Sequence, residues 1–267
     1  MLKSIVVGAS GRMGNRIIHA INETEGIEFF SGVENKGHPT IGQDVGEVVG
    51  LGRLNIEIKD DLNTVAHLGD VIIDFTNSTA SINHLKIAAE NKTPIVIGST
   101  GFSAEEMAEA ERLSRNTKCV LAPNMSVGVN LLFKVIGDVS RVLGDDYDIE
   151  VVEAHHRFKK DSPSGTAVKI GRIIAETLKR DLDEVGVYGR KGIIGERTQK
   201  EIGFQVIRAG DIVGEHTVIF GGLGERLEIT HRAHSRDNFA RGAVKAAKWI
   251  VNQENGLYDM QDVLGLK

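Results

Sequence analysis

The chain has 267 residues, of which 41% are hydrophobic and 26% are charged, and its formal net charge is −5. This mixture predicts a globular protein with a sizeable core, and the length allows two modest domains. The net negative charge argues against general nucleic-acid binding. No run of about 18 apolar residues occurs, so we expect a cytoplasmic protein without membrane contact.

In the first half of the chain, short apolar runs alternate with segments of helical period. The runs that predict strands are SIVVGA, IEFFSGVE, DVIIDFT, TPIVIGST and TKCVLAPN. The last run should bury the single cysteine, Cys119, in the core. Helices are predicted over residues 12–22, 80–91 and 104–116. This order of elements predicts an α/β domain with a parallel, doubly wound sheet of the Rossmann type.

The rhythm changes after Ser126. A helix over 127–143, the strand DIEVVEAHH and an amphipathic helix over 165–179 come first. Three strand-like runs then follow without helices between them: GFQVIRAGD, GEHTVIFGG and ERLEITHRAH. They predict an α+β second domain with a mainly antiparallel, open sheet.

A final helix is predicted over residues 237–251, with Ser235 as its N-cap. We expect residues 1–126 to form a dinucleotide-binding domain, to which 236–267 return. Residues 127–235 should form the substrate-binding domain.

The sequence GASGRMG places Gly8, Gly11 and Gly14 between the first strand and the first helix. Glycines there let the backbone approach a pyrophosphate, which the free N–H groups of the helix N-terminus can bind. The spacing differs from the usual G-x-G-x-x-G, so the motif alone is a weak signal. Glu34, at the end of the second strand, strengthens it because an acidic side chain there can bind the ribose hydroxyls of NAD.

Two further loops follow predicted strands, FTNS after the third and GSTG after the fourth. In an open α/β sheet, ligands bind at this carboxyl edge. Either loop could also be an ordinary polar turn.

The stretch EAHHRFKKDSPSGTA, residues 153–167, gathers two histidines, basic groups and a helix start. His155 and His156 lie at a strand end and point to opposite faces. SPSGTA predicts a helix N-terminus in which Ser164 caps and open amides can bind a carboxylate, although a plain helix cap would have the same sequence. Cations, an imidazole and such a turn together favour a small acidic substrate that undergoes proton transfer.

Metal binding is the main alternative for the histidines. His231 and His234 could join the pair, but the sequence offers no cysteine partners, and positions 231 and 234 would face opposite ways on a strand. We therefore predict no metal site.

Taken together, GASGRMG, GSTG, APNMSVGVN, EAHHRFKKDSPSGTA, AGDIVGEHTVIF and ERLEITHRAHSR resemble the signatures of the dihydrodipicolinate reductase family, in order and over nearly the whole chain. The resemblance implies NADH- or NADPH-dependent reduction of a small cyclic dicarboxylate, 4-hydroxy-tetrahydrodipicolinate, with loss of water, in lysine and diaminopimelate biosynthesis. It also implies a homotetramer built through the open sheet of the second domain.

The resemblance assigns roles to residues of this chain. His155 and Lys159 are the implied catalytic residues, and His156, Ser164, Gly165 and Thr166 would hold the substrate. The residues implied to contact the cofactor are Gly8, Ala9, Ser10, Gly11, Arg12, Met13, Glu34, Gly98, Ser99, Thr100, Ala122, Pro123, Asn124 and Met125.

The chain departs from the family pattern beside Glu34. The family often has a basic residue directly after this position, suited to the 2′-phosphate of NADP, whereas this chain has Asn35 followed by Lys36. Glu34 favours NADH, and Lys36 could still reach a phosphate, so both cofactors stay open. GSTG also has Ser99 where threonine is common, and FTNS lacks a proline often found there.

Two other functions compete with the reductase. One is another two-domain dehydrogenase, for example one that acts on aspartate, and the other is a non-catalytic NAD-binding sensor. The histidine pair with Lys159 and the Ser-Gly-Thr turn argue against the first, and a sensor would need neither His155 nor Lys159.

Overall fold

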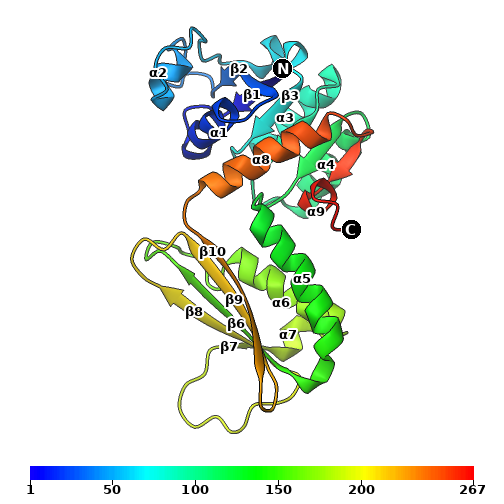
Figure 1. The fold of residues 1–267 in the computed structure, drawn as a ribbon. Helices are drawn as coiled ribbons and strands as arrows, with labels where there is room; N and C mark the ends of the chain where they lie inside the picture. Colours follow the sequence, from blue (N-terminus) through cyan, green and yellow to red (C-terminus); the bar gives the residue numbers. More distant parts are fainter. The chain divides into compact units, whose positions relative to one another are not determined.

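The computed structural model describes all 267 residues, which form two compact units. The first unit comprises Met1–Val127 and Arg236–Lys267, and the second comprises Gly128–Ser235. Figure 1 shows the helices and strands along the chain. No helix is long and apolar enough to cross a membrane.

The first unit is a three-layer α/β structure. Its strands are β1 (Leu2–Val7), β2 (Ile27–Val33), β3 (Val71–Asp74), β4 (Ile95–Ile97), β5 (Lys118–Leu121) and β11 (Gly256–Tyr258). Its helices are α1 (Arg12–Asn22), α2 (Val45–Val49), α3 (Ser78–Asn91), α4 (Ala104–Ser114), α8 (Asp237–Ile250) and α9 (Met260–Val263). The strands pair in parallel in the order β11-β5-β4-β3-β1-β2, which confirms the predicted Rossmann-type sheet.

Alternating side chains of this sheet build two apolar cores. Val6 packs with α1 and α8 on one face, whereas Ile5 and Val7 pack with α3 and α4 on the other. Cys119 lies in the second core with no exposed surface, and burial raises the pKa of its thiol, so it is an inert core residue as predicted.

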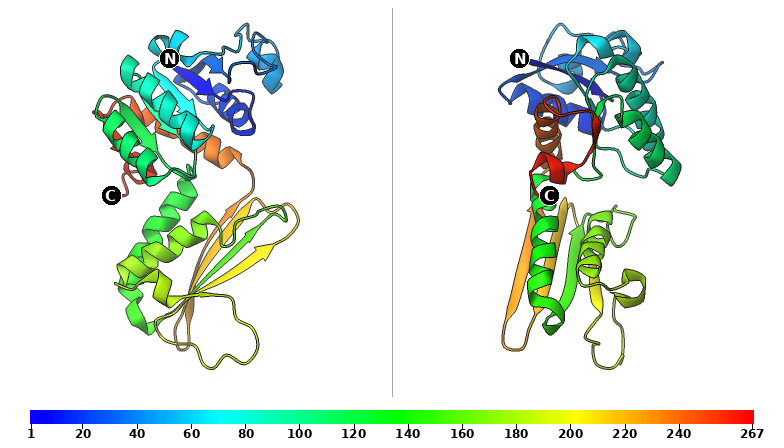
Figure 2. Two further views of the ribbon diagram at one scale, coloured as in Figure 1. Left: turned by 180° about the vertical axis from the view of Figure 1, so that it is seen from behind. Right: turned by 90° about the vertical axis from the view of Figure 1, so that its right-hand side faces the viewer.

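The second unit is a five-stranded sheet with helices on one face. Its strands are β6 (Asp148–His155), β7 (Gly186–Tyr188), β8 (Ile202–Arg208), β9 (Gly214–Gly221) and β10 (Arg226–Ala233). Its helices are α5 (Val127–Leu143), α6 (Gly165–Thr177) and α7 (Leu182–Val185). Figure 2 shows these helices on the same side of the sheet. Buried side chains of α5 and α6 pack there against β6, β8 and β9.

The second sheet is mixed rather than mainly antiparallel. Its order is β10-β9-β6-β8-β7, in which β9 is antiparallel to β10 and β6, but β8 is parallel to β6 and β7. β6 and β8 pair in parallel because α6 returns the chain to the end of the sheet at which β6 begins, before β8 starts. The elements α7 and β7 were not predicted.

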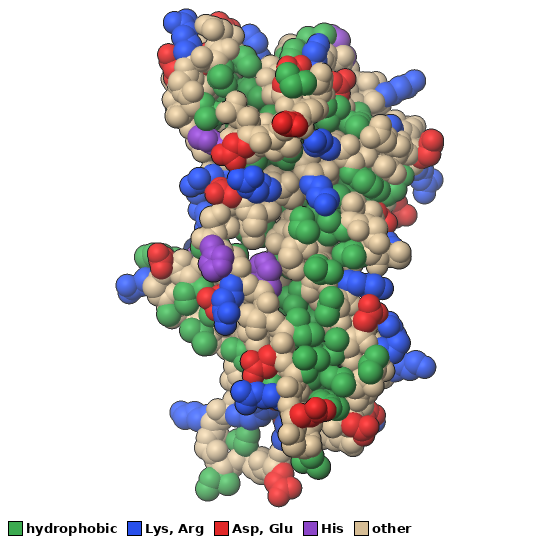
Figure 3. Space-filling view, in the orientation of Figure 1, with side chains coloured by type: hydrophobic (Ala, Val, Ile, Leu, Met, Phe, Trp, Pro, Cys, Tyr) green, Lys and Arg blue, Asp and Glu red, His purple; other side chains and the backbone are tan.

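Helix α8 begins after Arg236, which makes no side-chain capping hydrogen bond, so the prediction of Ser235 as the N-cap was wrong. Helix α5 keeps Leu131 and Val142 exposed, and Figure 3 shows apolar side chains along this helix on the visible face.

Candidate active site

The turn between β1 and α1 depends on its glycines. Gly8 has a φ of +72°, a left-handed conformation that favours glycine. A Cβ at Gly14 would lie only 2.0 Å from the carbonyl oxygen of Gly8, so the helix can approach the turn only without a side chain. No side chain caps α1, whose N-cap is Gly11. The turn therefore forms a close-fitting backbone cradle with helix N–H groups available to a phosphate.

Glu34 lies one residue beyond β2 and is joined to the glycine turn. Its carboxylate accepts hydrogen bonds from the backbone N–H (2.9 Å) and the hydroxyl (2.5 Å) of Ser10. The strand end and the turn are thus brought together, and a diol could take the place of the serine contacts on this carboxylate.

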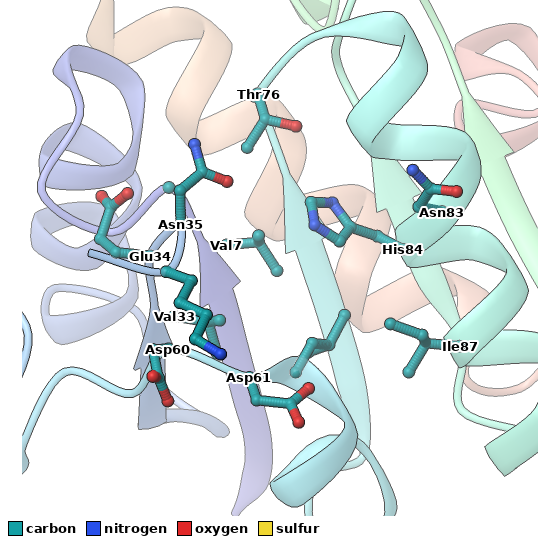
Figure 4. A pocket seen from close by; sticks show the side chains of 13 residues that line it. Val7, Val33, Glu34, Asn35, Asp60, Asp61, Thr76, Asn83, His84 and Ile87 are labelled. Carbon is teal, nitrogen blue, oxygen red and sulfur yellow. The ribbon is translucent and has the colours of Figure 1, made fainter. Parts of the chain in front are cut away.

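A pocket of about 210 Å³ opens beside Glu34. Figure 4 shows Glu34, Asn35 and Thr76 around it, with His84 projecting from α3. The imidazole Nδ1 of His84 lies 2.8 Å from the buried carboxylate of Asp74. This carboxylate also accepts a hydrogen bond from the hydroxyl of Thr76. Lys36 lines the same pocket. The pocket therefore has the polar lining and the position at the carboxyl ends of β1 and β2 that suit a nucleoside.

The other predicted cofactor loops follow β4 and β5 at the same edge of this parallel sheet. A Cβ at Gly98 would lie 2.2 Å from the ring of Phe75, so this loop also needs glycine. Ser99 is buried, and its hydroxyl lies 2.8 Å from that of Ser81. Ala122 and Met125 are buried in the core, which leaves mainly backbone groups of this loop to meet a ligand.

In the second unit, the end of β6 carries a buried carboxylate and an imidazole on one face. Glu153 and His155 are two residues apart, so both point toward the α6 side of the sheet. Nδ1 of His155 lies 2.5 Å from Oε2 of Glu153. Burial alone would raise the pKa of Glu153, but hydrogen bonds from His155, Arg208 and the N–H of Ser164 lower it to about 2. This carboxylate is therefore ionised at neutral pH.

Ser164 caps α6 as predicted. Its hydroxyl accepts a hydrogen bond from the N–H of Ala167 (3.2 Å) and lies 3.0 Å from Nε2 of His216. A Cβ at Gly165 would meet no atom within 4 Å, so the helix start is open on that side. Burial, and next the neighbouring His155, lower the pKa of His216 to about 3, which keeps this imidazole neutral beneath the helix N-terminus.

The loop between β6 and α6 carries the remaining predicted residues. The ammonium group of Lys159 lies 3.0 Å from Oδ1 of Asp161. The buried Nδ1 of His156 has no hydrogen-bond partner in the structure. This unit thus combines an imidazole, a primary amine and a helix N-terminus, which can transfer protons and bind a carboxylate.

Models of known protein families match both units of the chain. The family model described as "Dihydrodipicolinate reductase, N-terminus" matches residues 2–125, and that described as "Dihydrodipicolinate reductase, C-terminus" matches residues 128–264. The chain belongs to the dihydrodipicolinate reductase family. The resemblance found in its motifs is therefore confirmed over nearly the whole sequence.

Curated dihydrodipicolinate reductases match the chain from end to end. Proteins named 4-hydroxy-tetrahydrodipicolinate reductase from Syntrophus aciditrophicus (strain SB) and Geotalea uraniireducens (strain Rf4) are 61% and 59% identical to it, with 100% of both chains covered in each case.

Solved structures support the fold. A dipicolinate-bound dihydrodipicolinate reductase from Paenisporosarcina sp. TG-14 superposes with a TM-score of 0.77 at 23% identity, with 98% of each chain covered. An amine dehydrogenase from Mycobacterium smegmatis has a TM-score of 0.58 at 15% identity, covering 96% of this chain and 94% of its own. The fold is therefore shared with other dehydrogenases and does not by itself select the substrate.

Sequence reasoning missed three residues of this reductase's second unit. They are Glu153, Arg208 and His216, which contact the predicted residues His155 and Ser164 or one another. Glu153 carried a usable signal, because it stands two residues before His155 on a predicted strand and so shares its face. Arg208 and His216 lie more than 40 residues further along the chain, and only strand pairing brings them to this face.

Proposed function

We propose that the chain reduces 4-hydroxy-tetrahydrodipicolinate to tetrahydrodipicolinate, with loss of water and oxidation of NADH or NADPH. The observation that carries this proposal is the full-length 61% identity to a reductase named for that substrate. The reaction is a step of lysine and diaminopimelate biosynthesis, for which we place the protein in the cytoplasm.

The first unit has the features needed to hold the dinucleotide. The glycine turn and the N-terminus of α1 would bind its pyrophosphate, and Glu34 would bind the adenosine ribose beside the pocket of Figure 4. When bound, the reduced nicotinamide supplies a hydride. The loops 98–100 and 122–125 would add contacts through backbone groups.

The second unit has the groups needed to hold the substrate and move protons. The N-terminus of α6 at Gly165 and Thr166, with the cap Ser164, would bind one substrate carboxylate, and His156 would assist them. Loss of the 4-hydroxyl as water leaves a conjugated ring, and hydride addition to it creates an electron-rich carbon. Lys159 would protonate this carbon, and His155 would donate or accept the proton that Lys159 exchanges.

The reaction assay tests the proposal directly. The substrate is generated in situ from pyruvate and aspartate semialdehyde by the condensing enzyme that precedes this step, and loss of reduced-nicotinamide absorbance is followed with NADH and NADPH in parallel. We expect oxidation that depends on the condensing enzyme. A folded protein that binds NADH but oxidises neither cofactor would favour the rival dehydrogenase or the non-catalytic sensor, and oxidation with aspartate-type substrates would identify the former.

A further inference from the structure

The carboxylate of Glu153, next to His155, makes four hydrogen-bond contacts. Oε2 of Glu153 meets Nδ1 of His155 at 2.5 Å and Nη1 of Arg208 at 2.8 Å. Oε1 accepts from the N–H of Ser164 at 2.9 Å and from Nη2 of Arg208 at 2.9 Å. The side chain is only 1% exposed. Four donors and no room to turn hold this carboxylate in one orientation.

The ionisation of Glu153 fixes the role of its oxygens. With a pKa of about 2, the group carries no proton at neutral pH, so both oxygens can only accept hydrogen bonds. The imidazole nitrogen that faces Oε2 must therefore carry the hydrogen. In neutral His155, this places the proton on Nδ1 and leaves the lone pair on Nε2.

The surroundings of Nε2 of His155 are more open than those of Nδ1. Gly214 stands next to it on β9, and a Cβ at that position would lie 3.1 Å from Nε2 and 3.3 Å from the adjacent ring carbon. The glycine therefore leaves space at the nitrogen that would exchange a proton. The opposite nitrogen is enclosed by Glu153.

Arg208 connects this carboxylate to the loop that carries Lys159. Besides its two bonds to Glu153, the guanidinium donates to the backbone carbonyl oxygen of Asp161 at 2.6 Å. The side chain of Asp161 in turn lies 3.0 Å from the ammonium of Lys159. A single guanidinium thus ties the support of His155 to the position of the amine.

From these contacts we propose that Glu153, clamped by Arg208, is a positioning residue that keeps His155 in the form protonated at Nδ1, with Nε2 free for proton exchange. The inference rests on the proposed reductase function for its kinetic consequence. Its structural consequence, the tautomer of His155, can be measured without any turnover.

The test compares Glu153→Gln with Glu150→Gln. Glu150 is a matched control because it lies on the same strand, faces the other side of the sheet and forms its own two-bond pair with Arg190 at 2.8 and 2.9 Å. In E153Q, the amide NH₂ must face donors, so the network breaks and can present a donor to Nδ1. We expect kcat to fall about 10²-fold or more, as when an imidazole loses the carboxylate that orients it. KM and NADH affinity should change little relative to E150Q, whereas the thermal midpoint should fall further because buried donors lose their acceptor.

A second readout uses ¹⁵N-histidine-labelled protein at about pH 8, where an unperturbed imidazole is neutral. We expect the His155 resonances of wild type and E150Q to show a protonated Nδ1, and those of E153Q to show a loss of this form. Unchanged His155 resonances in folded E153Q would overturn the proposal, as would equal losses of turnover in E153Q and E150Q. An inactive wild type with the expected resonances would instead reject the proposed function and leave the inference standing.

If E153Q does not fold, Arg208→Lys serves in its place. A lysine keeps the charge but cannot bind both carboxylate oxygens in parallel. We expect a fall in kcat of about tenfold with unchanged NADH affinity. Wild-type turnover in folded R208K would show that the clamp does not position the site.

Discussion

Lys159 and Lys160 are neighbours in sequence but differ in environment. Lys159 has a side chain 22% exposed and paired with Asp161, whereas Lys160 is exposed to solvent. Because a general acid contributes about 10²–10⁴-fold to rate, we predict that Lys159→Ala lowers kcat by that factor while NADH still binds. Steady-state kinetics and NADH fluorescence titration measure the two effects. Lys160→Ala is the control and should stay close to wild type, and near-normal turnover in K159A would remove Lys159 from catalysis.

We expect Glu34 to be the residue that distinguishes NADH from NADPH. Its carboxylate can accept from the 2′- and 3′-hydroxyls of NADH, but it repels the 2′-phosphate of NADPH. We predict that Glu34→Ala weakens NADH binding about tenfold and NADPH binding much less, as measured by calorimetric titration. Glu57→Ala, which removes an exposed carboxylate of the same unit, should alter neither affinity. Equal weakening of both cofactors in E34A would exclude the ribose contact.

The residues of the site differ in how well the sequence could identify them. His155, Lys159 and Ser164 lie within twelve residues of one another, so local pattern was enough to gather them. Arg208 reaches Glu153 across 55 positions, and its role depends on the pairing of β8 with β6. No local pattern contains that pairing, because the free energy that selects it comes from side chains distant in the sequence.

The N-terminus of α6 contacts a neutral histidine. His216 lies beneath the cap Ser164, and its folded-state pKa of about 3 is far below the ordinary value of 6.5. Between these two values the unfolded chain binds a proton that the folded protein does not, so stability falls as pH decreases through this window. We predict that His216→Gln flattens the decline in thermal midpoint from about pH 6.5 toward pH 4. Thermal unfolding at several pH values measures it.

An exposed histidine provides the control for this prediction. His67→Gln removes an ionisable group that is exposed in the first unit, and the pH dependence of its thermal midpoint should match that of wild type. A decline in H216Q as steep as in wild type would mean that other groups, such as Glu153, carry the acid sensitivity.

The sequence predicted the ends of two helices more accurately than it predicted which strands pair. The predicted helices 12–22 and 127–143 agree with α1 and α5 at both ends, because apolar periodicity and local turns define them. The second sheet was predicted as mainly antiparallel because three strands follow one another in the chain. In the structure β8 and β9 are not neighbours, since β6 lies between them. Hydrophobic alternation identifies a strand and its buried face but not its partner.

The second sheet has one face without helices. Figures 1 and 2 show α5, α6 and α7 on the other side. Alternation places Val152, Ala154, Ile207 and Ile219 on the face without helices. Glu150, Gln205 and Thr217 share this face, so it is mixed in polarity. A second copy that covers its apolar side chains would stabilise it, and closed symmetry then gives a dimer or tetramer.

The resemblance to the reductase family implies a homotetramer, so we predict that light scattering after size exclusion gives about four times the 29.0 kDa chain mass. Ile207→Lys should lower that mass, because it places a charge in the buried centre of a contact between sheets. Leu68→Lys is matched to it, since both side chains belong to residues that are 48% exposed, but Leu68 lies in the first unit and its change should leave the mass unaltered. A monomeric wild type would exclude the assembly, and an unchanged tetramer in I207K would move the interface to another surface.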